Sequence, residues 1–134
     1  MHLWPVRVYY EDTDAGGIVY YANYLRFVER GRTEMLRAAG LDQVGMLEGE
    51  GVGFVVRRIE ADYLAPARLD DVLEVETTMP DPPGRSRVTL RQRVLRGEAV
   101  LFDATVVLVA VRLRGEGAGR PVRLPAAAAA IFRP

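Results

Sequence analysis

Polar and apolar residues alternate along several stretches of the chain, which is the pattern of strands that bury one face. The first stretch runs from Leu3 to Tyr10, and Pro5 stands where it suits an edge strand. Four more stretches follow after residue 50, and the last of them is almost continuously apolar, as expected of a strand buried on both sides. They read GFVVRRIEADYL, DVLEVETTM, RSRVTLRQRVL and AVLFDATVVLVAVRL, at residues 53–64, 71–79, 85–95 and 99–113.

A helical period separates the first predicted strand from the others. Between residues 24 and 39 the apolar residues recur at spacings of three, four and seven, which predicts an amphipathic helix. Asn23 suits its N-cap and Gly40 its C-terminal stop. Gly31 stands inside this helix, where glycine costs about 1 kcal/mol relative to alanine. We therefore expect the helix backbone to lie close against a flat surface such as a sheet.

The predicted order is one strand, one long helix and then four strands in succession. This order is typical of an α+β domain in which one long helix packs on a mainly antiparallel, five-stranded sheet. We expect residues 1–134 to form a single domain, with an irregular tail from about residue 115 whose alanine run adds a short helical turn or none. A single helix covers one face of a sheet, so the arginine-rich strand faces are either solvated or in contact with a second copy of the chain.

Composition narrows the possible chemistry. Eighteen arginines balance eighteen acidic residues, so nothing in the net charge attracts the chain to nucleic acid or anionic membranes. His2 and Ser86 are the only histidine and serine, and cysteine is absent, so neither a serine–histidine nor a cysteine–histidine pair is plausible. If the chain is an enzyme without a cofactor, its acid–base group is a carboxylate. We also expect a cytoplasmic protein, because no signal-peptide layout or membrane-spanning apolar run is present.

Three carboxylates and two glycines gather in EDTDAGG, residues 11–17, between the first strand and the helix. Asp12, Asp14 and Gly17 match three positions of a calcium-binding EF-hand loop. However, Asn23 stands where that loop needs a bidentate glutamate, and no helix precedes the segment. The segment therefore either caps the helix, whose dipole favours nearby carboxylates, or places a carboxylate in a cleft that the flanking tyrosines make partly apolar.

In two long blocks the chain closely resembles the YbgC-type, Tol-Pal-associated acyl-CoA thioesterases of the 4-hydroxybenzoyl-CoA thioesterase family. The blocks are RVYYEDTDAGGIVYYANYLRFVERGRTEML and FVVRRIEADYLAPARLDD, and the resemblance runs from about Pro5 to Leu113. It implies a hotdog fold, in which a curved antiparallel sheet wraps one long helix and two chains pair to continue the sheet, commonly in a dimer of dimers. It also implies hydrolysis of acyl-CoA to a free acid and CoA, with no metal and no cofactor beyond the CoA of the substrate.

The resemblance assigns roles to four residues of the first block. Asp14 corresponds to the catalytic carboxylate, which either attacks the thioester carbonyl or activates the water that does. Tyr10 and Gly17 border the substrate. The backbone N–H of Tyr21, just before the helix, polarises the thioester oxygen. Many YbgC-type members have histidine in place of Tyr21, but a backbone donor survives the exchange.

The second block supplies the other expected substrate contacts, Val56, Arg57 and Arg58. In this fold the region usually faces the helix start of the partner chain, and guanidinium groups suit the phosphates of CoA. Acyl carrier protein is a second candidate carrier of the acyl group. The rival interpretation is a non-hydrolytic acyl-thioester or protein-binding module of the Tol-Pal system. An intact EDTDAGG motif disfavours it, because a pure binder needs no poised carboxylate.

Overall fold

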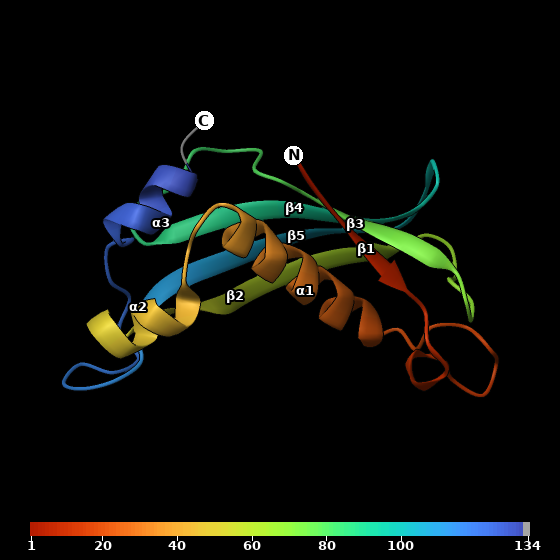
Figure 1. The fold of residues 1–134 in the computed structure, drawn as a ribbon, viewed down its shortest axis with the longest axis horizontal. Coiled ribbons are helices and arrows are strands. Elements are labelled where there is room, and N and C mark those ends of the chain that lie inside the picture. Colours follow the sequence, from red (N-terminus) through yellow and green to blue (C-terminus); the bar gives the residue numbers. More distant parts are fainter. Residues whose placement is uncertain (133–134) are drawn as a thin grey trace.

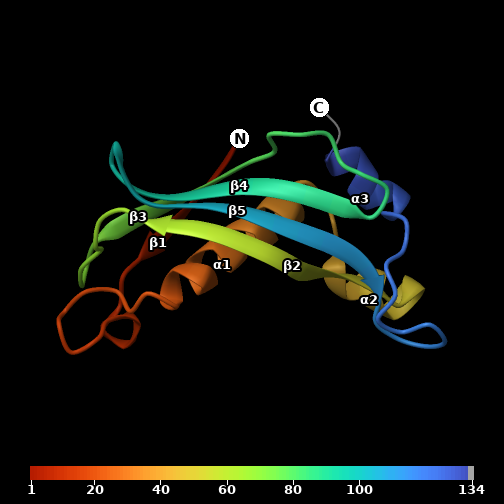
Figure 2. The ribbon, with the colours of Figure 1, turned by 180° about the vertical axis from the view of Figure 1, so that it is seen from behind.

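A computed structural model of the chain describes residues 1–132, in which one long helix lies across a five-stranded sheet (Figure 1). All neighbouring strands are antiparallel and their order is β1-β3-β4-β5-β2, so β1 and β2 are the two edges. Seen from behind, the strands lie in front of the helix and curve around it (Figure 2). The expected α+β architecture is therefore confirmed. The strands are β1 (His2–Arg7), β2 (Val52–Tyr63), β3 (Val72–Thr78), β4 (Arg87–Arg96) and β5 (Ala99–Arg112).

The long helix is α1 (Asn23–Ala38), and its apolar stripe faces the sheet. Gly40 follows it with a φ of 91°, a conformation that glycine adopts without strain, and so ends the helix as predicted. Asn23 is the first helical residue rather than the cap, because its side-chain amide donates to the carbonyl oxygen of Asp12 at 2.9 Å. The predicted N-cap was therefore wrong by one residue. The buried residues of the stripe are Tyr24, Phe27, Val28, Gly31, Met35 and Leu36.

At Gly31 the backbone of α1 lies close against the sheet. A Cβ atom at this position would lie 2.4 Å from Cγ1 of Val75 in β3. Next to this contact, the fully buried Gln92 of β4 donates to the carbonyl oxygen of Val28 at 2.8 Å and to Thr77 Oγ1 at 2.9 Å. The expectation that the helix backbone lies against the sheet is confirmed.

The opposite face of the sheet carries paired charges. The Arg91 guanidinium contacts the Asp103 carboxylate at 2.8 Å, and Arg93 contacts Glu76 at 2.7 Å. The guanidinium groups of Arg91 and Arg93 are thus paired with carboxylates of their own sheet. Strand β2 has a bulge at Arg57, where its register with β5 shifts.

Several segments differ from the sequence expectation. Strand β1 ends at Arg7 instead of Tyr10, because the chain turns into a short 3-10 helix, η1 (Tyr10–Asp12). A second helix, α2 (Gln43–Glu50), precedes β2 where no helix was expected. The alanine run forms α3 (Ala126–Ile131), which resolves the alternative left open for the tail.

Candidate functional site

The acidic segment folds into a tight hairpin immediately before α1. The N–H of Asp14 donates to the carbonyl oxygen of Ile18 at 2.9 Å, and the N–H of Gly17 donates to the carbonyl oxygen of Asp14 at 3.0 Å. Gly17 closes this turn with a φ of 77°, a conformation in which a side chain would be strained. The N–H of Gly16 donates to Oδ1 of Asp14 at 2.8 Å. The turn therefore fixes both the backbone and the carboxylate of Asp14.

A second loop, residues 64–71, supports this hairpin from the side. The N–H of Val19 donates to the carbonyl oxygen of Ala67 at 2.9 Å, and Ile18 forms an isolated antiparallel bridge with Arg68. The N–H of Ala67 in turn donates to the buried hydroxyl of Tyr24 at 3.0 Å. The loop thus joins the Asp14 hairpin to the first turn of α1.

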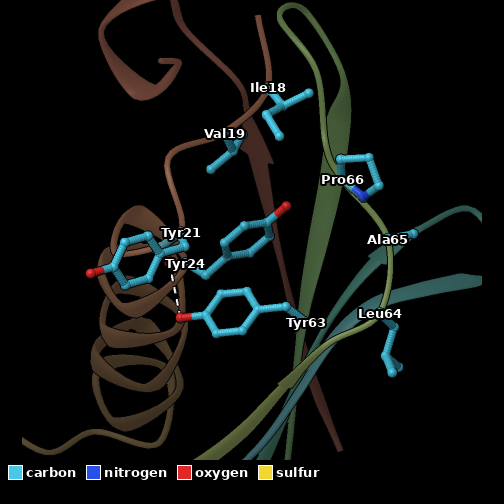
Figure 3. Close-up of a pocket in the computed structure, with 8 residues that line it drawn as sticks. All are labelled: Ile18, Val19, Tyr21, Tyr24, Tyr63, Leu64, Ala65 and Pro66. Carbon is cyan, nitrogen blue, oxygen red and sulfur yellow. Dashed lines mark hydrogen bonds between the residues drawn. The ribbon is translucent and has the colours of Figure 1, made fainter. Parts of the chain in front are cut away.

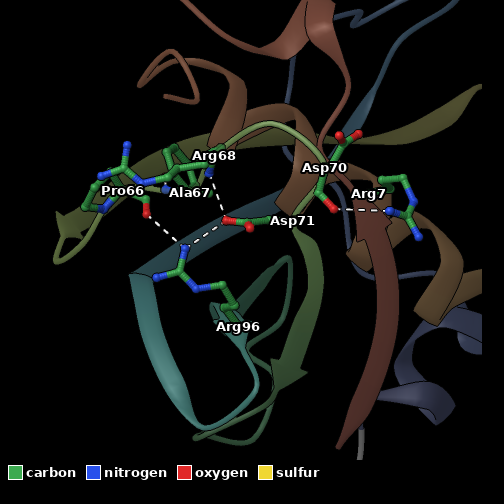
Figure 4. Close-up of polar contacts among 8 residues, drawn as sticks. Arg7, Pro66, Ala67, Arg68, Asp70, Asp71 and Arg96 are labelled. Carbon is green, nitrogen blue, oxygen red and sulfur yellow. Dashed lines mark hydrogen bonds and ion pairs between the residues drawn. The ribbon is translucent and has the colours of Figure 1, made fainter. Parts of the chain in front are cut away.

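An ion pair holds the same loop to the end of β4 (Figure 4). Nη1 of Arg96 donates to Oδ2 of Asp71 at 2.8 Å and to the carbonyl oxygen of Pro66 at 3.2 Å. Oδ2 of Asp71 also accepts the N–H of Arg68 at 2.8 Å. Burial alone would raise the pKa of the Asp71 carboxyl, but the Arg68 N–H and the Arg96 guanidinium outweigh it, so the pKa is lowered. Asp71 therefore stays ionised at neutral pH and holds the loop to the end of β4 through Arg96.

Three tyrosines meet where the hairpin enters α1 (Figure 3). The hydroxyl of Tyr63, at the end of β2, donates to the carbonyl oxygen of Tyr21 at 3.0 Å. The ring of Tyr63 lies edge-on to the rings of Tyr21 and Tyr24, with centroids 6.1 and 5.6 Å away. Within residues 1–132 no carbonyl or side-chain oxygen accepts the N–H of Tyr21. This backbone donor is therefore free to meet a ligand.

The same tyrosines line an apolar pocket of about 350 Å³. No residue of its lining carries a formal charge, so the pocket suits an uncharged apolar group. Among the described residues the lining includes Ile18 of the Asp14 hairpin but not Asp14 itself, so the hairpin borders the pocket through Ile18. The lining consists of Ile18, Val19, Tyr21, Tyr24, Tyr63, Leu64, Ala65 and Pro66.

Comparison with known proteins gives consistent matches. The model of the thioesterase-like superfamily matches residues 8–132. The chain is 45% identical over 129 residues to the acyl-CoA thioesterase YbgC of Haemophilus influenzae, covering 96% of this chain and 92% of that one. It is 52% identical over 106 residues to the acyl-CoA thioester hydrolase YbgC of Escherichia coli O6:H1, covering 79% and 78%. The chain belongs to the thioesterase-like superfamily.

A solved structure supports the fold of this thioesterase. The crystal structure of a probable thioesterase from Bartonella henselae matches it with a TM-score of 0.84 and 38% identity, over 92% of this chain and 98% of that one. The resemblance to YbgC-type thioesterases and the hotdog fold are thus confirmed, and so is the enzyme class, a thioester hydrolase.

The seven predicted site residues of this thioesterase lie in two separate groups. Tyr10, Asp14, Gly17 and Tyr21 belong to the segment before α1. They are exposed, with Tyr10 83% and Tyr21 61% accessible to solvent. A site built on this segment alone is therefore open on one side.

The second group, Val56, Arg57 and Arg58, is also exposed and lies in the middle of edge strand β2. Arg57 occupies the bulge, and Arg58 forms an ion pair with Glu60. Arg58 precedes Tyr63 by five residues, so at 3.3 Å per residue it lies about 17 Å away along the strand. A single chain does not bring the two groups together.

Sequence reasoning did not single out Tyr63, Asp71 or Arg96 as parts of the site. Tyr63 contacts Tyr21 directly, whereas Asp71 and Arg96 hold the 64–71 loop that supports the hairpin. These contacts join residues distant in the sequence, and the alternation of β2 gives Tyr63 no feature of its own. Among residues 1–132 no three His, Asp or Glu side chains gather closely enough to hold a metal ion. In the same part of the chain, no helix combines the length and apolarity that crossing a membrane requires.

Proposed function

We propose that this thioesterase hydrolyses acyl-CoA thioesters, with Asp14 as the nucleophile or general base and the Tyr21 N–H as the oxyanion donor. One observation carries the proposal. The hairpin that fixes Asp14 and the turn that leaves the Tyr21 N–H free flank the same apolar pocket. A carboxylate base and an N–H donor thus stand on two segments that flank one apolar pocket, and a thioester needs little more, because it is already an activated acyl compound.

The reaction has two possible routes from this arrangement. As a general base, Asp14 takes a proton from water while the water oxygen bonds to the thioester carbon. The C–S bond then breaks, and the proton passes to the CoA thiolate. As a nucleophile, the Asp14 carboxylate bonds to that carbon, CoA leaves, and water cleaves the resulting anhydride. In both routes the carbonyl oxygen becomes negative, and the Tyr21 N–H next to the α1 N-terminus stabilises it.

The pocket indicates the class of acyl group. A volume of about 350 Å³ holds an acyl chain but not the CoA portion, which then extends into solvent or along a partner chain. The uncharged lining favours a small or medium apolar acyl group, either aliphatic or aromatic. An acyl chain carried on acyl carrier protein would present the same atoms to the pocket.

We further propose that a second copy completes the site by pairing along β2. This strand is a 12-residue sheet edge, and Val56 on it is 44% exposed, although such edges are normally paired or protected. Antiparallel pairing of two β2 strands would bring Arg57 and Arg58 of one copy toward the α1 start of the other, where CoA phosphates need cations. A dimer of dimers and a cytoplasmic location remain predictions.

Thiol release from a panel of short aliphatic, long aliphatic and hydroxybenzoyl CoA thioesters tests the proposed function. We expect turnover in the wild type and a loss of at least about 10²-fold in Asp14→Asn, because general-base catalysis contributes roughly 10²–10⁴-fold. Asp81→Asn, an exposed carboxylate in the β3–β4 loop, is the matched control. Absence of wild-type turnover on every thioester would favour the non-hydrolytic Tol-Pal binding module. Full activity in Asp14→Asn would show that another residue is catalytic.

A further inference from the structure

We propose that Tyr63 is a positioning residue, whose hydroxyl holds the Tyr21 backbone so that its N–H is aimed at the thioester oxygen. The inference rests on the proposed function, because it assigns a task to a residue within the same site. Tyr63 does not act on the substrate through its hydroxyl, which is already engaged by Tyr21 (Figure 3). It acts on the peptide group that follows Tyr21 and, by restricting the backbone dihedrals of Tyr21, on the direction of the Tyr21 N–H.

The hydroxyl of Tyr63 is placed by the core of the fold. Its ring packs edge-on against the fully buried Phe102 of β5, with centroids 5.1 Å apart and planes at 70°. It also packs edge-on against Tyr24, whose ring is stacked on Phe102 at 5.2 Å. A side chain held on two sides by buried rings has little rotational freedom. The position of its hydroxyl is thus set by β2, β5 and α1 rather than by the hairpin.

The Tyr21 backbone needs such a contact because it belongs to an exposed turn. The preceding peptide is held at one point, where the carbonyl oxygen of Tyr20 accepts the N–H of Asn23 at 2.8 Å. The following peptide is held where the carbonyl oxygen of Tyr21 accepts the Tyr63 hydroxyl at 3.0 Å. Together the two hydrogen bonds restrict both backbone dihedrals of Tyr21. Without the second one, water can replace the hydroxyl and the direction of the Tyr21 N–H becomes variable.

The Tyr63 hydroxyl is suited to donate this hydrogen bond at neutral pH. Burial and the neighbouring hydroxyls of Tyr21 and Tyr24 raise the pKa of Tyr63 above the ordinary value for tyrosine. The group therefore remains protonated at neutral pH, and a carbonyl oxygen can only accept from it.

Tyr63→Phe tests the proposal, because it removes the hydroxyl and keeps the ring that packs on Phe102. An oxyanion donor whose N–H points away from the thioester oxygen binds the transition state less tightly, and this loss exceeds the loss in substrate binding. We therefore expect kcat to fall about 10-fold, a part of the roughly 10²–10³-fold that a whole donor contributes. KM should stay within about twofold. Tyr9→Phe is the matched control, because in the described chain the Tyr9 hydroxyl has no hydrogen-bond partner.

Amide hydrogen exchange supplies a readout independent of turnover. In Tyr63→Phe the amide of Asn23, which donates to the carbonyl oxygen of Tyr20, should exchange faster, while the amides of β2 and β5 keep their protection. A role limited to packing predicts the opposite, since it would lower the melting temperature and loosen the sheet with little change in kcat relative to KM.

The outcomes separate this inference from the proposed function. If the wild type has no turnover, or Asp14→Asn keeps it, the proposed function fails and this inference fails with it. If Asp14→Asn is inactive but Tyr63→Phe has wild-type kcat, the positioning role of Tyr63 alone is refuted. An equal fall of kcat in Tyr63→Phe and Tyr9→Phe would also refute it, because only one of these hydroxyls contacts the site.

Discussion

Gly31 of α1 and Val75 of β3 lie so close that a Cβ on the glycine would be 2.4 Å from Cγ1 of the valine. Val75 is fully buried in the middle strands of the sheet, so its side chain has no free space to move into. The distance between helix and sheet is set by this contact. Because α1 carries the turn that presents Tyr21, the contact also sets how far the site stands from the sheet.

Gly31→Ala should lower the free energy of unfolding by about 1–3 kcal/mol, the usual effect of overpacking a core. The energetic cost of the clash exceeds the roughly 1 kcal/mol by which alanine is favoured over glycine inside a helix. Gly49→Ala is the matched control, because a Cβ at that position of α2 would meet nothing within 4 Å. Urea unfolding of the two variants measures the difference. Equal stability of Gly31→Ala and the wild type would contradict the close packing of α1 on β3.

The main features of the fold could be predicted because they depend on local patterns. Alternation predicted the first four strands, a nearly continuous apolar run predicted the last, and Gly31 indicated a helix lying on a sheet. The errors arose where a tertiary contact decided the outcome. The Asn23 amide donates to the carbonyl oxygen of Asp12, a contact that no local pattern reveals, and α2 combines glycine with a weak apolar pattern that gave no helical signal.

Asp71→Asn should reduce stability at neutral pH by about 0.5–1 kcal/mol, the range for a partly exposed ion pair. The pKa of Asp71 is lowered in the folded protein, so its contribution is complete above the unfolded value of about 3.9. It disappears as the pH falls through the folded value. Urea unfolding should therefore show a smaller difference from the wild type at pH 3 than at pH 7. An equal difference at both values would mean that the Asp71 charge is not its source.

Gly16→Ala should disturb the carboxylate of Asp14 without unfolding the protein. A Cβ on Gly16 would lie 3.2 Å from Oδ1 of Asp14, the same atom that accepts the Gly16 N–H. The carboxylate must shift by a few tenths of an ångström, and we expect kcat to fall about 10-fold because catalysis is sensitive to such displacements. Gly84→Ala in the β3–β4 loop is the control, since its nearest contact would be 3.6 Å. Unchanged kcat in Gly16→Ala would argue against Asp14 as the reacting group.

The site could be predicted only as far as the linear motif reached. EDTDAGG lies in one segment, and the structure places its residues in one hairpin. The hairpin is supported from β2, from β4 and from the loop between β2 and β3, by Tyr63, Arg96 and Asp71 respectively. This support follows from the folding of the chain and not from the motif. Arg57 and Arg58 lie in the middle of β2, apart from the hairpin, and only the proposed pairing of two chains would bring them to it.

Val56→Glu should dissociate the proposed pair of chains and abolish turnover together. Pairing along β2 would place the introduced carboxylate and its copy at one interface, where like charges without partners are strongly unfavourable. Light scattering should give the wild type a mass two or four times the 14.9 kDa of one chain. The Val56→Glu variant should have the mass of a single chain. Circular dichroism should remain unchanged, because Val56 is 44% exposed in the single chain.

Val44→Glu is the control for this experiment, because it places the same charge on an exposed apolar position of α2, outside the edge strand. It should keep both the mass and the activity of the wild type. A Val56→Glu protein that remains associated and active would exclude β2 as the pairing edge. One that becomes a monomer but keeps full kcat and KM would show that each chain holds a complete site. In that case Arg57 and Arg58 would have no part in binding CoA across the pair.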